Sequence, residues 1–210
     1  MKRFILSAIL VLLSGCGTIV SLTPEKRASI GSLSLESQIN KPKTIEFGGR
    51  LMELFAPGIG GLSGSLIQSA SESVNQPKDQ RFTAFLNDSG IDISQIFYEQ
   101  LDTRLKAHPF FSSRYKENGT YKLRVEISSY SYHPKNTFSN YYKPWVMVTY
   151  HINSPSNEII AKGVASSGAF NNRLPENTLE QVYADPQLLK NAFISAVDFA
   201  IEDILDQLMK

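Results

Sequence analysis

The most reactive side chains in this sequence are one cysteine and three histidines. Cys16 is the only thiol in 210 residues, and the histidines are His108, His133 and His151. No two histidines have a metal-ligand spacing such as i, i+4 on a helix. A single thiol also cannot form a disulfide within the chain. The sequence therefore predicts no metal site and no cofactor.

The sequence also lacks clear motifs for serine catalysis, for phosphate binding and for acid/base catalysis by paired carboxylates. There is no Gly-x-Ser-x-Gly nucleophile elbow, and Gly61-Leu62-Ser63-Gly64 misses that spacing by one residue. No glycine-rich loop is followed by Lys and Ser or Thr. Asp203 and Asp206 fit a solvated helix face better than an acid/base pair. We therefore expect a protein that is not an enzyme and has no catalytic residues.

The residues before Cys16 have the pattern of a secretory signal peptide. Lys2 and Arg3 precede an apolar run from Phe4 to Leu13, and the small residues Ser14 and Gly15 follow it. A run of about ten residues is too short to cross a bilayer as a helix. A basic start, a short apolar run and a small-residue end predict a cleaved signal peptide at 1–15.

Leu13-Ser14-Gly15-Cys16 resembles the lipobox of bacterial lipoproteins. The resemblance implies that the Cys16 thiol receives a diacylglycerol, that a peptidase cuts before it, and that its amine is then acylated, with fatty chains such as palmitate. Gly17, where Asp would retain a lipoprotein in the inner membrane, implies sorting to the periplasmic side of the outer membrane. The alternatives are a plain signal peptide with an incidental cysteine, or a buried thiol in an uncleaved strand.

Composition indicates a folded domain without a nucleic-acid partner. Hydrophobic residues make up 42% of the chain, charged residues 20%, and the formal net charge is +1. A nucleic-acid-binding domain usually carries a concentrated basic stripe, and none is visible here. We expect a lipidated tether at 16–27 and a single α+β periplasmic domain at 28–210. As a flexible coil, the tether would reach about 18 Å.

A glycine-rich insertion interrupts the domain at 47–81. Gly58, Gly60, Gly61 and Gly64 cluster in it, and Gly60 and Gly64 have the small-xxx-small spacing of closely packed helices in lipid. One hypothesis is a contact with the membrane or with a second copy of the chain, which would make a homo-oligomer. The other is a long loop with a short helix rich in small residues, since glycine weakens helices. The polar stretch from Ser69 to Arg81 is expected to be mobile.

Hydrophobic periodicity predicts two helices and four strands around this insertion. Asp92 is expected to cap the first helix in a capping box with Gln95, and Asp185-Pro186 to open the second. The change of phase after Ile127 suggests a bulge or the end of the buried part of that strand. The predicted elements are strand Ser29–Ile39, helix Ile91–Ala107, strands Tyr121–Ile127, Pro144–Ile152 and Glu158–Ser167, and a last helix from Pro186 to Leu208. The expected fold is a three- to four-stranded antiparallel or mixed sheet with two helices packed on one face.

Aromatic residues gather between two of the predicted strands. They are Tyr130, Tyr132, Phe138, Tyr141, Tyr142 and Trp145. Tyr and Trp provide rigid amphipathic contact area and are enriched in binding surfaces. One hypothesis is that this loop binds a protein partner or, alternatively, glycan or lipid headgroups. The other is that the rings cover one end of the sheet.

The order of elements after the lipobox is similar to that of several envelope lipoproteins. They are the curli-secretion lipoprotein, the activator lipoproteins of penicillin-binding proteins and the auxiliary lipoproteins of ABC-type lipid transporters. The resemblance covers roughly Ser29 to Lys210 in layout only. It implies a non-enzymatic accessory role that depends on an envelope protein partner in an assembly, secretion or transport machine. The alternative is a lipid-tethered periplasmic enzyme with a deep polar pocket near His133 or His151.

Overall fold

The structure is a computed structural model that describes residues 19–48, 77–136, 138–168 and 171–210. The predicted signal peptide, Cys16 and the four glycines Gly58, Gly60, Gly61 and Gly64 lie outside these residues. Among the helices in the described part of the chain, none is long and apolar enough to cross a membrane.

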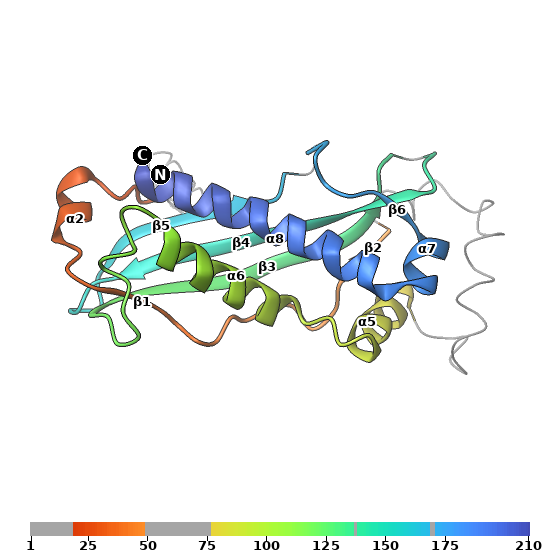
Figure 1. The fold of residues 1–210 in the computed structure, drawn as a ribbon, viewed down its shortest axis with the longest axis horizontal. Helices are drawn as coiled ribbons and strands as arrows, with labels where there is room; N and C mark the ends of the chain where they lie inside the picture. The colour runs from red at the N-terminus through yellow and green to blue at the C-terminus, as the bar shows by residue number, and fades with distance from the viewer. Residues whose placement is uncertain (1–18, 49–76, 137, 169–170) are drawn as a thin grey trace, which may run out of the picture.

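A mixed sheet forms the centre of the molecule (Figure 1). Strands β3 (Tyr121–Pro134), β4 (Tyr141–Asn153) and β5 (Ile159–Ser166) follow one another as an antiparallel meander. Strand β1 (Leu33–Leu35) pairs in parallel with β3, which gives the order β1-β3-β4-β5. Two short strands add to the sheet. Strand β2 (Glu46–Phe47) pairs in parallel with β3, and β6 (Asn177–Thr178) pairs antiparallel with β4. The mixed sheet confirms the predicted α+β class.

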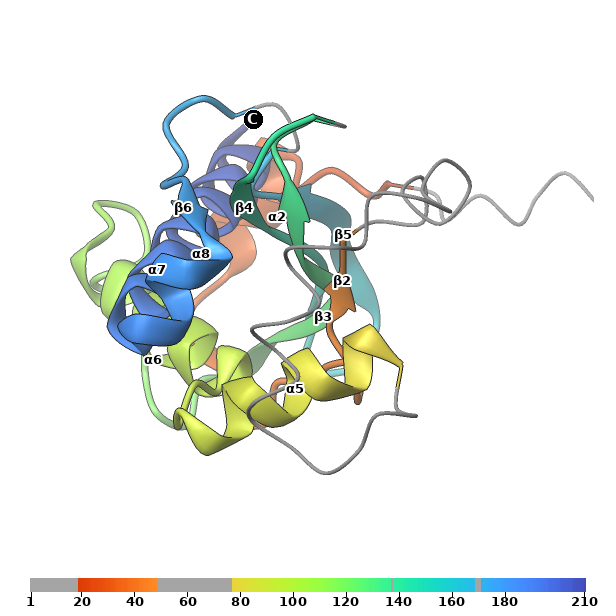
Figure 2. The same ribbon diagram turned by 90° about the vertical axis from the view of Figure 1, so that its right-hand side faces the viewer.

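Helices α6 (Ile93–Ala107) and α8 (Pro186–Met209) lie on one side of this sheet, as expected (Figures 1 and 2). Helix α8 packs on β4, β5 and α6. The predicted cap of α8 is confirmed, since the Asp185 carboxylate accepts a hydrogen bond from the Gln187 backbone amide at 3.0 Å. Asp92 caps α6 by accepting from the Ser94 amide at 3.0 Å. The predicted capping box is wrong, because Gln95 does not accept a hydrogen bond from the Asp92 backbone amide; its side chain donates to Glu99 at 2.8 Å.

Helix α5 (Lys78–Asp88) is an element that the sequence analysis did not predict. It begins directly after Pro77, and Phe82 and Leu86, four residues apart, are both buried. This i, i+4 pair is enough to fix one face of a short helix against the sheet. Residues 78–81 are therefore helical rather than mobile. Because Phe47 belongs to β2, the predicted insertion at 47–81 is too wide at both ends.

The chain is already attached to the domain at the start of the described residues. The backbone amides and carbonyls of Val20 and Lys162 exchange two hydrogen bonds of 2.9 Å, and Leu22 is buried. Helix α2 (Pro24–Ser29) follows, and Arg27 donates to the Met209 carbonyl at 2.6 Å. The flexible tether predicted at 16–27 is therefore wrong from Ile19 onward. The first strand is also shorter than expected, since α2 occupies Ser29.

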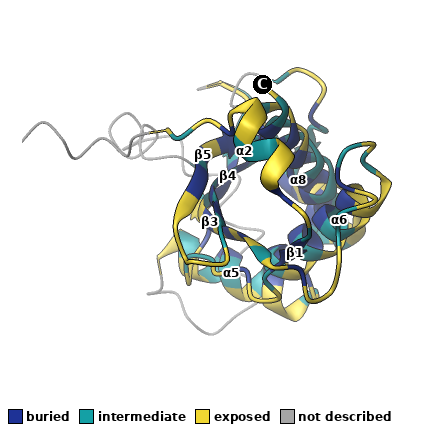
Figure 3. Ribbon diagram, turned by 90° about the vertical axis from the view of Figure 1, so that its left-hand side faces the viewer, coloured by how far each residue is buried: buried dark blue, intermediate teal, exposed yellow. Residues whose placement is uncertain are grey.

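The core lies between the sheet and the helices, with buried positions around one shared interior (Figure 3). On β4, Val146, Val148 and Ile152 are buried, whereas the alternating residues are only half-buried and belong to the outer face. The exposed edge of β5 is closed by side chains from α8. Gln207 donates to the Val164 carbonyl at 2.8 Å, and Asp203 accepts from the Ser166 amide at 3.1 Å. Such capping protects an edge strand from pairing with another chain.

Candidate binding surface at the hairpin tip

The β3–β4 hairpin carries the predicted aromatic loop, and a bulge decides which of its rings are inside. The pairing register shifts between Ile127 and Ser129, which confirms the bulge predicted there. The extra residue keeps Tyr130 and Tyr132 on the core side, where their exposed fractions are 3% and 0%. The partner-binding role predicted for these two tyrosines is therefore wrong, because a ring without exposed surface cannot contact a partner.

Tyr132 belongs to a stack of rings that closes the interior beside α5. Its ring centroid lies 5.7 Å from Phe82 and 5.7 Å from Tyr142, and Phe47 lies 4.5 Å from Phe82 and 5.6 Å from Tyr142. Burial raises the pKa of both Tyr132 and Tyr142, so both phenols stay neutral at ordinary pH. Tyr142 is half-buried and thus has mainly a packing role. For Tyr130, Tyr132 and Tyr142, the interpretation that the rings cover one end of the sheet is therefore the one that fits.

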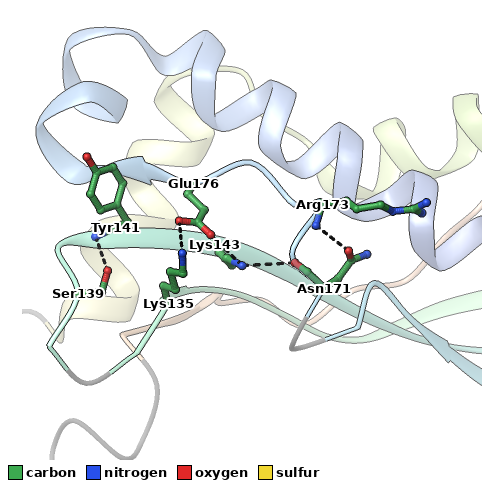
Figure 4. Close-up of polar contacts among 7 residues, drawn as sticks. All are labelled: Lys135, Ser139, Tyr141, Lys143, Asn171, Arg173 and Glu176. Atoms are coloured by element: carbon green, nitrogen blue, oxygen red, sulfur yellow. Dashed lines mark hydrogen bonds and ion pairs between the residues drawn. The ribbon is translucent and has the colours of Figure 1, made fainter.

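Phe138 and Tyr141 are the rings that the hairpin tip presents to solvent. Their exposed fractions are 92% and 49%. Two hydrogen bonds hold the described backbone on either side of the turn. The Phe138 amide donates to the Asn136 side chain at 3.1 Å. The Tyr141 amide donates to the Ser139 hydroxyl at 3.0 Å (Figure 4). Trp145 is half-buried on the outer face, opposite Ser131 of β3. The surface available to a partner is therefore Phe138 and Tyr141, with Trp145 further along the strand. We call Phe138 and Tyr141 the hairpin tip.

A buried ion pair connects the start of β4, close to the turn of the hairpin, to the loop that precedes β6 (Figure 4). The Lys143 ammonium lies 3.0 Å from one Glu176 carboxylate oxygen and 3.4 Å from the Asn171 carbonyl, and its side chain is only 5% exposed. The other Glu176 oxygen accepts from Lys135 at 3.0 Å. Hydrogen bonds from Lys143 and Lys135 lower the pKa of Glu176. We call Lys135, Lys143, Asn171 and Glu176 the clamp, which ties the start of β4 and Lys135 to the loop before β6.

Sequence reasoning missed the clamp because its parts are far apart along the chain. In the sequence, Lys143 is one charge within the aromatic loop, directly before the predicted strand Pro144–Ile152. Nothing in its spacing points to Glu176, 33 residues later. Only the pairing of β4 with β6 brings the two together.

The three histidines occupy separate environments. His108 follows α6 and accepts from the Phe110 amide, and burial lowers its pKa. His151 lies on the outer face between Arg124 and Lys162, and burial lowers its pKa, with Arg124 adding to the effect. No group of three or more His, Cys, Asp or Glu side chains in the described ranges is placed to hold a metal ion.

His133 is the histidine that comes nearest to a catalytic arrangement, since its Nδ1 lies 3.2 Å from the Ser131 hydroxyl. Burial lowers its pKa, and the neighbouring Lys143 ammonium acts in the same direction. A neutral imidazole that acts as a general base becomes cationic as it takes a proton, and an ammonium beside it opposes that change. The contact follows from two alternate residues on one face of a strand.

A shallow depression of about 470 Å³ lies between the end of β5 and α8. It is lined by Ser166, Ser167, Gly168, Asn171, Phe199, Glu202, Asp203 and Asp206. Two of its acids already have structural partners: Asp203 binds the Ser166 amide and Gln207, and Glu202 lies 3.5 Å from Arg173. Neither His133 nor His151, the residues around which an enzyme pocket was expected, is among its lining residues.

Comparisons with known proteins give only weak similarities. No protein-family model matches the sequence, and no curated protein is similar to it. The crystal structure of protein XCC0632 from Xanthomonas campestris, of the DUF330 family, has 13% identity and a TM-score of 0.35 over 90% of this chain and 94% of that one. Lipoprotein GNA1162 from Neisseria meningitidis has 11% identity and a TM-score of 0.23 over 77% of this chain and 99% of that one. Both TM-scores are below 0.5, so neither likeness supports a conclusion about function.

Proposed function

We propose that this chain is a lipid-anchored accessory lipoprotein of the Gram-negative envelope. It acts without catalysis, by binding a protein partner in an assembly, secretion or transport machine. The observation that carries the proposal is Leu13-Ser14-Gly15-Cys16, with the only thiol of the chain at the acylation position. Gly17 favours the periplasmic side of the outer membrane. With three acyl chains, attachment would be effectively permanent, because two chains already suffice for stable anchoring.

The hairpin tip is the part of this proposal that concerns the partner. Large exposed aromatic side chains on a fixed backbone can bind with little loss of conformational entropy. Phe138 and Tyr141 meet this description, and the buried Lys143 of the clamp holds the strand that carries Tyr141. Exposed aromatic side chains such as these are suited to a protein groove, which is the kind of contact an accessory protein needs.

A non-catalytic role is supported by two polar side chains, His133 and Asp203, whose surroundings fit a structural role. The His133 imidazole is next to an ammonium, and Asp203 is bound to backbone and to Gln207. For the alternative of a lipid-tethered enzyme near His133 or His151, the one contact of this kind in the described residues is that between His133 and the Ser131 hydroxyl, and the adjacent Lys143 ammonium opposes protonation of that imidazole. We therefore retain binding as the proposed activity.

The anchor is tested by growing cells with labelled palmitate. We expect label in the wild-type protein and none in Cys16→Ser. Equal labelling of both proteins, or no labelling of either, would reject lipid anchoring.

The partner surface is tested by placing a photo-crosslinking amino acid at Tyr141 and, as a control, at Thr103 on the exposed side of α6. We expect one discrete protein adduct from position 141 in intact cells and none from position 103. Equal adduct patterns from both positions would reject the hairpin tip as the binding surface.

A further inference from the structure

Large hydrophobic side chains reach solvent in two separate places on the described surface. Two of them, Phe138 and Tyr141, form the hairpin tip. The other three are Ile19, Ile159 and Val164, with exposed fractions of 66%, 44% and 47%. Val164 pairs with Thr149, eight residues from Tyr141 along β4, so the two places are about 27 Å apart.

The second group surrounds the place where the N-terminal segment joins the sheet. Val20 bridges Lys162 of β5, directly next to Ile19. Ile159 and Val164 lie opposite Asn153 and Thr149, which are outer-face residues of β4. Residues that are directly opposite in a ladder have their side chains on the same face of the sheet. Ile159 and Val164 therefore belong to the outer face of β5, on the side away from α6 and α8.

This surface is close to the predicted lipid. Only Gly17 and Thr18 separate Cys16 from Ile19. Three extended residues span at most about 11 Å. Since residues from Ile19 onward are attached to the domain, an acylated Cys16 must hold the β5 edge within that distance of the bilayer surface.

We propose that the outer face of the β5 edge, formed by Val20, Ile159 and Val164 and flanked by the exposed Ile19, lies against the lipid bilayer that contains the acyl chains. This inference rests on the acylation of Cys16 in the proposed function. Protein contact by strand addition is disfavoured there, because Val20, Gln207 and Asp203 already occupy backbone groups of the edge. What remains available is a set of aliphatic side chains with Lys162 among them. A lysine can lay its aliphatic stem on apolar surface and keep its ammonium at the level of the lipid headgroups.

The test uses the full acylated chain with one introduced cysteine, labelled with an environment-sensitive fluorophore. Ile159→Cys and Val164→Cys report the proposed contact, and Thr103→Cys on α6 is the control on the opposite side. The proteins are reconstituted into vesicles of phosphatidylethanolamine and phosphatidylglycerol, some carrying nitroxide-labelled lipid. Because both replaced side chains are about half exposed, we expect the variants to fold, and circular dichroism checks this before labelling.

We expect the emission from positions 159 and 164 to shift to the blue and to be quenched by the nitroxide lipid, with neither effect at position 103. Emission like that at position 103 would overturn the proposal. A blue shift without nitroxide quenching would also overturn it, because a protein surface, such as a second copy, would then cover the edge.

The parent chain without an added cysteine separates the two hypotheses. If it takes up fluorophore, Cys16 is free and the proposed lipid anchor fails. If it takes up none but is bound to vesicles, a negative result at positions 159 and 164 rejects the membrane-facing edge alone.

Discussion

The clamp predicts an asymmetry between its two charged partners. The Lys143 side chain is 5% exposed, whereas that of Glu176 is 25% exposed and keeps Lys135 at 3.0 Å. Removing Glu176 therefore leaves the buried Lys143 ammonium without its anionic partner. Removing Lys143 leaves the Glu176 carboxylate in contact with water and with Lys135. The two substitutions should differ in cost although they break the same ion pair.

The expected magnitudes follow from this difference in solvation. Loss of one partner of a buried ion pair costs about 3–5 kcal/mol. In Glu176→Ala the Asn171 carbonyl, 3.4 Å from the ammonium, remains as an acceptor, so we expect a loss near the lower end, about 3 kcal/mol. In Lys143→Met the lost charge-assisted hydrogen bond is offset because an ammonium no longer has to be desolvated. We expect a net cost of about 1 kcal/mol or less.

The measurement is equilibrium urea unfolding of the mature chain in a Cys16→Ser background, which removes the acyl chains. Lys135→Met is the matched control, since it removes a cation from the same carboxylate at a site that is 46% exposed, and should cost about 0–1 kcal/mol. A Lys143→Met variant destabilised as much as Glu176→Ala, or more, would refute the burial asymmetry.

Further predictions concern the stack, the tip, a helix cap and pH. Phe82→Ala should lower the free energy of unfolding by about 3–5 kcal/mol, measured by urea denaturation, because the ring is buried among other aromatic rings. Phe138→Ala with Tyr141→Ala should change it by less than about 0.5 kcal/mol yet abolish partner crosslinking; an unfolded double variant would contradict an exposed tip. Asp185→Ala should cost about 1 kcal/mol by loss of the α8 cap, and Asp185→Asn should restore most of it. The pKa of Glu176 is lowered from 4.5 in the folded state, which then binds fewer protons than the unfolded chain. The contribution of this carboxylate to stability should therefore be present above pH 4.5 and be lost as the pH falls below it, and Glu176→Gln should remove this part of the pH dependence of urea unfolding.

Elements with a clear period and a clear start were predictable from the sequence. The alternation from Tyr121 to Ile127 gave one face of β3 correctly, and Asp185-Pro186 marked the start of α8. Helix α5 was hidden because polar residues outnumber apolar ones in it. Its buried residues are Phe82 and Leu86, and Phe85 packs beside them from a partly buried position. These few apolar residues stand in a polar stretch, which hides the helical period.

The binding surface was predictable only in part, because composition does not say which side of a strand a ring occupies. A single extra residue between Ile127 and Ser129 sends Tyr130 and Tyr132 into the core. Phe138 and Tyr141 remain exposed because Phe138 lies in the turn and Tyr141 is the first residue of β4, on its outer face. The clamp depends on a pairing between β4 and β6, which no local pattern encodes.

The attachment of the N-terminal segment also depends on distant contacts. The segment from Ile19 to Arg27 is short and partly polar, so the sequence alone predicts a tether. A bridge to Lys162 and a hydrogen bond to Met209, both more than 100 residues away, fix them in place. The sequence predicts the position of the proposed anchor, but not that the residues directly after it are attached to the domain.

The most direct test of lipid anchoring is the mass of the N-terminal peptide of the protein purified from envelopes. We predict a first residue of Cys16 carrying one diacylglycerol on sulfur and one acyl chain on the amine. A peptide that begins at any other residue, or one that begins at Cys16 with a free thiol, would contradict the proposed function and the membrane-facing edge that rests on it.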